Sequence, residues 1–184
     1  PKKTPKDEND VRVCADLRGL NKSIKREKYI LPTFEDICSK MKGCKVFSKI
    51  DLRSGYHQIP LDDESSYLTT FITPYGRFRY LRLPFGIASA SEIFQRRMHQ
   101  ALQGLDGVAV QQDDVCVGGE NDEIHDLRLD NVMKRLEELG AELSHHKCVF
   151  KVGSVEMTGN IFSGEGVSAC TRNSGDIGNF GETT

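Results

Sequence analysis

Two adjacent aspartates lie between two short apolar runs of the chain. Residues 108–110 and 115–117 are β-prone, so the segment Gln111-Gln112-Asp113-Asp114 is expected to form the turn of a hairpin. Side chains alternate along a strand, and only a turn lets adjacent carboxylates converge. Converging carboxylates repel each other in a low-dielectric surround unless a cation neutralises them. Aspartate is also a common turn residue, so the pair alone favours an ordinary turn.

A third aspartate changes this weighting. Asp51 follows the alternating segment 46–50, an expected strand, and the chain turns directly after it. If that strand lies beside the hairpin, Asp51, Asp113 and Asp114 meet at one sheet edge. Mg²⁺ takes a few carboxylates together with phosphate oxygens of a substrate. Two such ions, roughly 4 Å apart, can activate a hydroxyl and stabilise a leaving oxygen, so the pattern indicates a polymerase or a nuclease.

Two further features fit a phosphate-handling site, although each has an ordinary explanation. Residues 83–91 form a turn rich in small residues before a helix, where a backbone can approach a flat ligand. The same segment equally fits a helix start capped by Ser89 or Ser91. Arg12 and Arg18 could reach phosphates, but exposed arginines usually have no specific role.

The elements that must position these residues are an antiparallel sheet and amphipathic helices. Thr33, with Asp36 three residues on, predicts a helix that ends at Gly43. Residues 67–82 predict a hairpin around positions 74–76, and residues 11–15 predict a short strand.

Two longer helices and two more strands complete the predicted order. Apolar residues at three- and four-residue spacings predict a helix from Ser89 to near Gly104, with Gln95 among its polar residues, and another over 124–139. Two strands are expected within 149–162, and an untethered tail after Gly164. The predicted class is α+β, with helices packed on one face of an antiparallel sheet.

Length and composition fit one domain, or a domain with an appendage. The chain has 184 residues, a formal net charge of −2, 38% hydrophobic and 28% charged residues, and this composition argues against a wholly disordered chain. It has no apolar run long enough for a bilayer and no signal peptide, so no membrane partner is expected. Because it lacks an initiating Met, we expect a fragment of a longer chain.

Cysteine usage and charge distribution give weaker indications. Irregular spacing predicts reduced thiols and a cytoplasmic or nuclear location, and a zinc site at His145, His146 and Cys148 is disfavoured because no second ligand pair exists. Residues 1–50 hold 13 Lys/Arg and 7 Asp/Glu, whereas residues 101–184 hold 6 and 15. A basic N-terminal part fits polyanion binding, and equally a solvated surface. The six cysteines are Cys14, Cys38, Cys44, Cys116, Cys148 and Cys170.

Several longer segments closely resemble reverse transcriptases of Ty3/gypsy-type long-terminal-repeat retrotransposons. They are residues 13–21, 47–59, 69–76 and 83–98, in the order of the family, and the similarity extends over about 6–167. The resemblance implies a right-hand polymerase fold. Its fingers would be residues 1–44 and 61–88 and its palm residues 45–60 and 89–165, followed by a poorly structured tail at 166–184, with thumb and ribonuclease H regions absent.

The resemblance also implies the chemistry and the site residues. It implies RNA-directed transfer of deoxynucleotides from their triphosphates to a primer 3′-hydroxyl, on an RNA or DNA template. The thumb and ribonuclease H regions of a parent polyprotein would be further partners. Two Mg²⁺ ions, or Mn²⁺ as a substitute, would bind Asp51, Asp113 and Asp114. The implied nucleotide-binding residues are Arg12, Lys6, Tyr56, Phe85, Gly86, Gln112 and Lys147. Among them, Tyr56 would act as a gate against the ribose 2′-hydroxyl. The implied primer grip is Met157, Thr158 and Gly159.

Four departures from the family pattern keep an alternative open. Gln111 replaces the family's turn tyrosine, Ser91 a proline and Thr158 a leucine, and residues 169–184 lack the family's charged helix. The alternative is a decayed or co-opted domain that binds nucleic acid without polymerising. Primer extension by this chain and by Gln111→Tyr would separate the two, and cleavage without nucleotides would indicate a nuclease.

Overall fold

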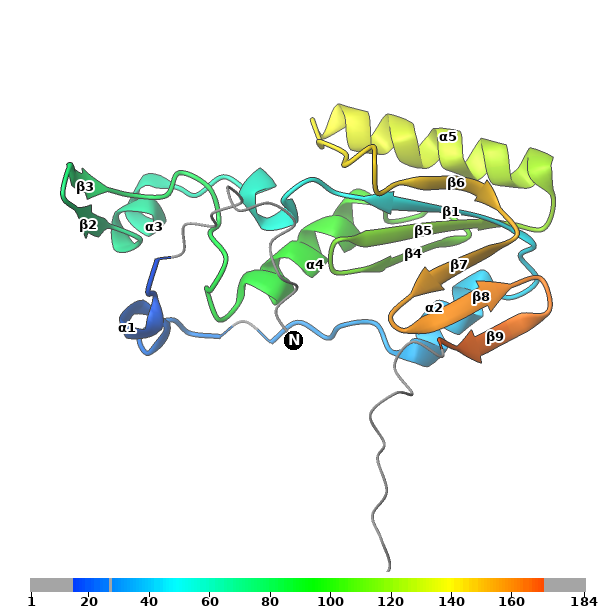
Figure 1. Ribbon diagram of the computed structural model, residues 1–184, viewed down its shortest axis with the longest axis horizontal. Helices are drawn as coiled ribbons and strands as arrows, with labels where there is room; N and C mark the ends of the chain where they lie inside the picture. The colour runs from blue at the N-terminus through cyan, green and yellow to red at the C-terminus, as the bar shows by residue number, and fades with distance from the viewer. Residues whose placement is uncertain (1–14, 27, 171–184) are drawn as a thin grey trace, which may run out of the picture.

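The centre of the molecule is a four-stranded antiparallel sheet (Figure 1). The structure is a computed structural model, and it describes residues 15–26 and 28–170. The strand order is β4-β5-β1-β6, and every pair is antiparallel. The strands at 46–50 and on both sides of the aspartate pair are therefore confirmed. Their bounds are β1 (Val46–Asp51), β4 (Val108–Gln111), β5 (Asp114–Gly119) and β6 (Val149–Val152).

Helices α4 (Ala90–Ala101) and α5 (Asp122–Glu138) pack against one face of this sheet. Alternate strand residues point to them, because successive side chains of a strand face opposite sides. The buried cluster between the helices and the sheet contains Ile50, Val110, Val115 and Val117 from strands, and Phe94, Met98, Val132 and Leu136 from helices. The expectation of helices on one face holds for these two, which are the longest.

The opposite face is also apolar and has a cover of its own. Helix α2 (Phe34–Met41) and a three-stranded sheet of β7 (Ser154–Met157), β8 (Asn160–Ser163) and β9 (Gly166–Ala169) lie over it. Thr33 caps α2 as expected, since its hydroxyl accepts from Asp36 N and the Asp36 carboxylate accepts from Thr33 N. Because Phe47 and Cys116 are buried on this side, α2 packs on the face opposite to α4 and α5.

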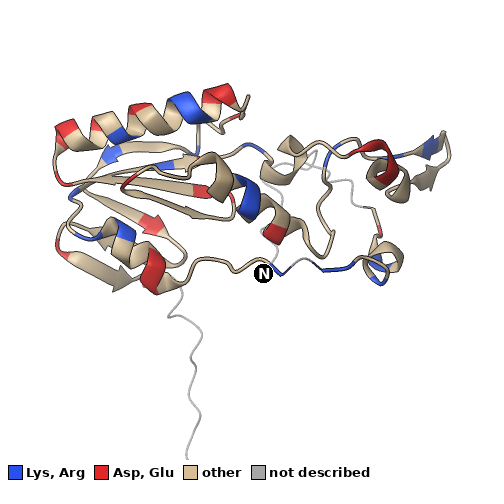
Figure 2. Ribbon diagram, turned by 180° about the vertical axis from the view of Figure 1, so that it is seen from behind, with Lys and Arg blue, Asp and Glu red and all other residues tan. Residues whose placement is uncertain are grey.

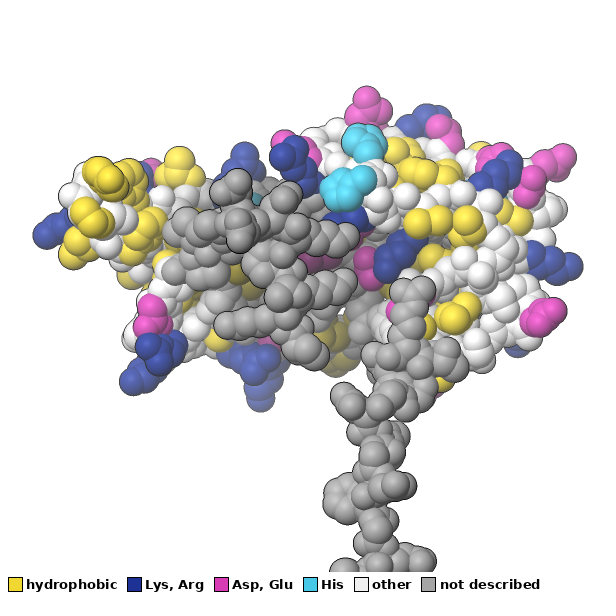
Figure 3. All heavy atoms as spheres, in the orientation of Figure 1, with side chains coloured by type: hydrophobic (Ala, Val, Ile, Leu, Met, Phe, Trp, Pro, Cys, Tyr) yellow, Lys and Arg dark blue, Asp and Glu magenta, His cyan; other side chains and the backbone are white. Residues whose placement is uncertain are grey.

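A smaller group of elements forms the other end of the elongated molecule (Figure 1). It consists of α1 (Arg18–Asn21), α3 (Asp63–Leu68), and the hairpin of β2 (Phe71–Thr73) and β3 (Gly76–Phe78). The hairpin around positions 74–76 is confirmed, but α3 is not predicted by the sequence. Its cap is Asp62, whose carboxylate accepts from Ser65 N. Exposed hydrophobic side chains gather at this end (Figure 3), among them Tyr67, Leu68, Ile72 and Tyr75.

The C-terminal part differs from the expectation. The predicted poorly structured tail from residue 166 is wrong for residues 166–169, because these pair with β8 as strand β9. The segment 149–162 begins three strands rather than two. A turn at Gly153 separates β6 from β7, so each joins a different sheet. The strand expected at residues 11–15 falls largely outside the described residues, as do positions 171–184.

Surface features agree with the sequence statistics. Acidic residues recur along α5 (Figure 2), which accounts for much of the negative charge of the C-terminal part. Within residues 15–26 and 28–170, no helix is both long and apolar enough to span a bilayer. The five cysteines in these ranges are free thiols, and Cys14 lies outside them.

Candidate active site

The three candidate aspartates lie at one end of the β1–β5–β4 ribbon. Strand β1 ends at Asp51 and β5 begins at Asp114, and these two residues are direct partners in the antiparallel ladder. Directly opposite residues project to the same face of a sheet, so the two carboxylates are neighbours. Leu52 N donates to Asp113 O at 3.3 Å, which fixes the turn beside the end of β1. The structure therefore brings these three residues together.

All three aspartates are partly buried, and Asp113 differs from the other two in its hydrogen bonding. Its Oδ1 atom is buried and has no hydrogen-bond partner among the residues that the structure describes. Burial raises the pKa of this carboxyl, and the negative charges of Asp51 and Asp114 raise that pKa further. A Cβ atom at Gly55 would collide with Asp113 Oδ1, so glycine at position 55 leaves room for the carboxylate. The site therefore holds a buried carboxylate oxygen that no described group satisfies.

Two lysines partly neutralise the other two aspartates. Lys49 Nζ lies 2.8 Å from Asp114 Oδ2, and it also donates to Glu156 O at 3.1 Å. Lys147 Nζ lies 3.6 Å from Asp51 Oδ1. In the described part of the chain, no three Asp, Glu, His or Cys side chains are arranged as a ready metal-binding group. Each of these two aspartates therefore has one ammonium group beside a carboxylate oxygen.

The aromatic residues of the candidate nucleotide site are adjacent to Asp113. The Tyr56 ring lies 5.1 Å from Phe85 and 5.6 Å from Phe94, measured between ring centroids. Burial raises the pKa of the Tyr56 hydroxyl, and the nearby charge of Asp113 adds to this shift. Tyr56 belongs to the short helix η1 (Gly55–Gln58), directly after the β1 end, so the strand that delivers Asp51 also positions this ring.

Asn21, which lies early in the chain, fixes the turn at Phe85 and Gly86 through two hydrogen bonds. Gly86 has φ 97°, a conformation that favours glycine. Asn21 Nδ2 donates to Gly86 O at 2.8 Å, and Asn21 Oδ1 accepts from Ala88 N at 2.9 Å. Asn21 is part of a segment that carries the family resemblance, but the sequence gives it no role. Its two bonds connect α1 to the turn before α4.

The candidate primer grip is a tight hairpin with one buried member. Thr158 (φ 55°) and Gly159 (φ 76°) connect β7 to β8. The Met157 side chain is 1% exposed and packs in the core below α2, so it cannot itself contact a ligand at the surface. Through Lys49, which bonds to Glu156 O, this hairpin is linked to Asp114.

Other predicted residues have less contact with the site. Arg12 and Lys6 lie outside the described residues. Gln112 is exposed at the turn, whereas Gln111 is half-buried, with an Oε1 atom that lacks a hydrogen-bond partner in the ranges described. His145 and His146 are exposed, and Cys148 Sγ accepts from Asp51 N at 3.4 Å.

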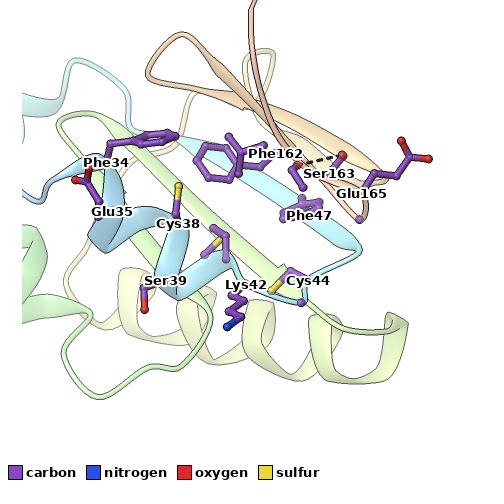
Figure 4. A pocket seen from close by; sticks show the side chains of 15 residues that line it. Phe34, Glu35, Cys38, Ser39, Lys42, Cys44, Phe47, Phe162, Ser163 and Glu165 are labelled. Carbon is purple, nitrogen blue, oxygen red and sulfur yellow. Dashed lines mark hydrogen bonds between the residues drawn. The ribbon is translucent and has the colours of Figure 1, made fainter.

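A separate hollow of about 680 Å³ lies between α2 and the β8–β9 sheet (Figure 4). Its lining includes Phe34 and Phe162, whose ring centroids are 6.2 Å apart, and the thiol of Cys38. None of the three aspartates lines it. The candidate chemistry is therefore at the sheet end and not in this hollow.

The fold is that of reverse transcriptases. The structure matches a foamy viral protease-reverse transcriptase solved in complex with an RNA/DNA hybrid, with a TM-score of 0.79 and 24% identity over 91% of this chain and 23% of that one. A second structure, a foamy viral protease-reverse transcriptase with double-stranded DNA, matches with a TM-score of 0.85 and 24% identity over 98% of this chain and 32% of the other.

The sequence assigns the chain to the same class. Residues 1–162 match the family described as reverse transcriptase (RNA-dependent DNA polymerase), and the chain belongs to this family. It is 40% identical over 153 residues to an uncharacterized protein of Caenorhabditis elegans, covering 82% of this chain and 12% of that protein. It is 35% identical over 160 residues to the retrovirus-related Pol polyprotein from transposon gypsy of Drosophila melanogaster, covering 86% of this chain and 16% of the polyprotein. The chain thus spans only a small part of these relatives.

Proposed function

We propose that the chain is the RNA-directed DNA polymerase domain of a long-terminal-repeat retrotransposon polyprotein. It transfers deoxynucleotides to a primer 3′-hydroxyl. The observation that carries the proposal is the meeting of Asp51, Asp113 and Asp114 at one sheet end, with a buried Asp113 oxygen that has no partner in the described structure. Family membership supports the same chemistry.

The three aspartates would hold two Mg²⁺ ions, for which Mn²⁺ can substitute. Carboxylate oxygens are the ligands that these hard cations prefer. When bound, the ions supply activation of the primer hydroxyl and stabilisation of the leaving pyrophosphate. The raised pKa of Asp113 supports the assignment, because positive charge at this place relieves the repulsion among the three carboxylates. With cations bound, Lys49 would exchange its contact with Asp114 for one with solvent or substrate.

The residues next to the aspartates would bind the incoming nucleotide. The Tyr56 ring, held between Phe85 and Phe94, is a rigid wall that excludes a ribose 2′-hydroxyl. Phe85 and Gly86 offer a ring and an open backbone to the base pair. Lys147 places its ammonium beside Asp51, where it can contact the triphosphate. Gln112, exposed at the turn, would be a further contact with the incoming nucleotide. Nucleotide binding by Arg12 and Lys6 stays a prediction.

The nucleic acid would lie along the face that carries the aspartates. We assign residues 1–44 and 61–88 to fingers and residues 45–60 and 89–165 to a palm. Thr158 and Gly159, at the tip of the hairpin that Lys49 links to Asp114, would contact the primer strand. Exposed aromatic residues of the α3–β3 end, such as Tyr67 and Tyr75, offer surfaces for base stacking. Further partners would be the thumb and ribonuclease H regions of the parent polyprotein, in the cytoplasm or nucleus.

Primer extension on an RNA template, with Mg²⁺ or Mn²⁺, tests the proposal. We expect extension by the unaltered chain and a loss of roughly a thousandfold in Asp113→Asn, because a metal supplies several kcal/mol of transition-state stabilisation. Gln111→Tyr should extend roughly tenfold faster, since the ring provides a packing surface for the primer end. Equal rates in the unaltered chain and Asp113→Asn would contradict the assignment.

The other outcomes define the competing functions. Binding of a primer–template duplex, without extension by the unaltered chain or by Gln111→Tyr, would indicate a nucleic-acid-binding domain. Cleavage in the absence of nucleotides would indicate a nuclease.

A further inference from the structure

Gln95 is a polar residue in the interior, and none of its side chain is exposed. It projects from α4 towards the β4–β5 hairpin. Its Nε2 atom donates to Val110 O at 2.8 Å, and its Oε1 atom accepts from Gln112 N at 2.8 Å. One side-chain amide therefore bonds to the backbone on both sides of Gln111. Asp113 follows directly after the second of these contacts.

The contact at Gln112 supports an unfavourable backbone conformation. Gln112 has φ 51°, in the left-handed region, which residues with a side chain seldom occupy. Such conformations persist only where the surrounding structure holds them. The hydrogen bond from Gln112 N to Gln95 is a fixed tie between the turn and a helix of the core. Without it, the aspartate turn would be held by its own two strands and by the bond from Leu52 N to Asp113 O.

His99, one helical turn beyond Gln95, sets which way the amide points. The Gln95 amide nitrogen lies 3.1 Å from His99 Nε2, and the Tyr29 hydroxyl lies 2.8 Å from His99 Nδ1. An amide nitrogen can only donate, so His99 Nε2 must be the unprotonated acceptor and Nδ1 must carry the proton. A reversed Gln95 amide would set its N–H groups against Gln112 N–H and its oxygen against Val110 O. Only one orientation satisfies all the groups.

The surroundings of His99 favour its neutral form. Burial lowers the pKa of its imidazole, and the ammonium of Lys40 in α2 lowers that pKa further. The groups that act on the ring are thus the Tyr29 hydroxyl, the Gln95 amide and the Lys40 charge, from three separate segments. Protonation would place an N–H donor at Nε2, facing the Gln95 amide nitrogen.

We propose that Gln95 is the positioning residue of the aspartate turn and that neutral His99 orients its amide. Gln95 does not touch the reacting groups. It holds Gln112, so that Asp113 stays beside Asp51 and Asp114. The hydrogen-bond arrangement stands on the structure alone, whereas its effect on cation binding rests on the proposed function.

Nuclear magnetic resonance of the unaltered, ¹⁵N-labelled chain tests the arrangement directly. We expect His99 to be neutral at pH 7 with its proton on Nδ1. As pH falls and His99 protonates, hydrogen exchange at the Gln112 amide should accelerate relative to the Cys116 amide in the middle of β5, after correction for intrinsic exchange. A proton on Nε2 would overturn the proposal. So would unchanged relative protection of Gln112 while His99 titrates.

Gln95→Met, with Gln100→Met as a matched control on the exposed side of α4, tests the consequence. We expect exchange at the Gln112 amide to become at least about tenfold faster in Gln95→Met, because one hydrogen bond is lost. Calorimetry should find Mn²⁺ bound about tenfold more weakly by Gln95→Met, with no change in Gln100→Met.

The outcomes separate this proposal from the proposed function. If the unaltered chain binds no Mn²⁺, the polymerase assignment fails, and the Gln112 exchange rates alone decide the role of Gln95. If Gln95→Met matches the unaltered chain in both measurements, the proposal is overturned. If Gln95→Met does not fold, the His99 tautomer and pH titration of the unaltered chain decide.

Discussion

Polar side chains are buried in two places beside strand β1, one at its middle and one at its end, and their hydrogen bonding differs between the two. In the interior, Ser48 and His125 are both fully buried and fully paired: Ser48 Oγ lies 2.9 Å from His125 Nε2 and accepts from Lys151 N at 3.0 Å. At the end, Asp113 Oδ1 is buried without a partner in the described structure. Satisfied polar groups stabilise a fold, whereas unsatisfied ones weaken it unless a ligand completes them.

The buried Ser48 network and the aspartate end of the sheet therefore have different tasks. The Ser48 network joins β1, α5 and β6, and its remaining ring nitrogen, His125 Nδ1, lies 3.0 Å from Asp126 Oδ1. It holds the sheet together. The aspartate end keeps like charges close together, which lowers stability in the absence of cations and creates affinity for them. Changes at the two places should therefore have effects of opposite sign on the stability of the metal-free chain.

The largest effect on stability is expected at Ser48. Ser48→Ala removes the partner of the buried His125 Nε2 and of the part-buried Lys151 N, leaving both groups unpaired. We expect the free energy of unfolding to fall by about 2–3 kcal/mol, and the melting temperature by roughly 5–10 °C. Thermal unfolding monitored by circular dichroism measures this. Ser39→Ala, on the exposed side of α2, is the control, and an equal melting temperature for both variants would contradict the network's role.

A smaller effect of opposite sign is expected at Asp113. Asp113→Asn removes a half-buried charge from beside two others, so the metal-free chain should become more stable by about 1 kcal/mol, or roughly 2–4 °C. Asp51→Asn is the matched comparison, and it should bring no such gain because Asp51 is paired with Lys147. Destabilisation by Asp113→Asn, in buffer free of divalent cations, would show that the carboxylate is a structural group.

The pH dependence of this gain follows from the direction of the pKa shift. The pKa of Asp113 is raised above its ordinary value of 3.8 by burial and by the neighbouring aspartates, so this carboxyl holds its proton more tightly in the folded chain than in the unfolded chain. The unaltered chain should lose stability as pH rises from about 3.8 through the raised pKa. The advantage of Asp113→Asn should therefore be present at pH 7 and shrink as pH falls towards 4. Melting temperatures of both chains between pH 4 and pH 7 measure this, and a constant difference would refute the shift.

The smallest effect is expected at the neighbouring hairpin. Thr158 occupies the left-handed region with a β-branched side chain, at φ 55°. Thr158→Gly should raise the free energy of unfolding by about 0.5 kcal/mol, because relief of this conformation slightly exceeds the added flexibility of the unfolded chain. Chemical denaturation resolves such a difference. A loss of stability would mean that the Thr158 side chain makes contacts that outweigh its backbone conformation.

Local patterns predict much of this structure. The capping residues of α2, the strand that ends at Asp51 and the turn that carries Asp113 follow from residues that are close in sequence. The pairing of Asp51 with Asp114 follows once the two strands are neighbours. The resemblance to a known family supplied the expected roles of Tyr56 and Lys147, which local patterns do not give.

The missed features depend on contacts between distant segments. The amphipathic pattern counts Gln95 only among the polar residues of its helix, whereas in the structure it is buried against the aspartate turn. A signal existed, since Gln95 lies next to Phe94 and four residues before His99. The partners of Lys49 and Asn21 lie 65 or more positions away, and no local periodicity points to them. Strand β9 pairs through its backbone and is largely exposed, so apolar content did not indicate it.

The central claim is that Asp51, Asp113 and Asp114 form one cation site. The most direct test is the melting temperature of the unaltered chain and of Asp113→Asn, with and without Mn²⁺ or Mg²⁺. At a hundredfold excess over the dissociation constant, a cation bound only by the folded chain adds about 2.7 kcal/mol, or roughly 5–10 °C. We expect this rise in the unaltered chain and almost none in Asp113→Asn. An equal rise in both, or none in either, would contradict the account.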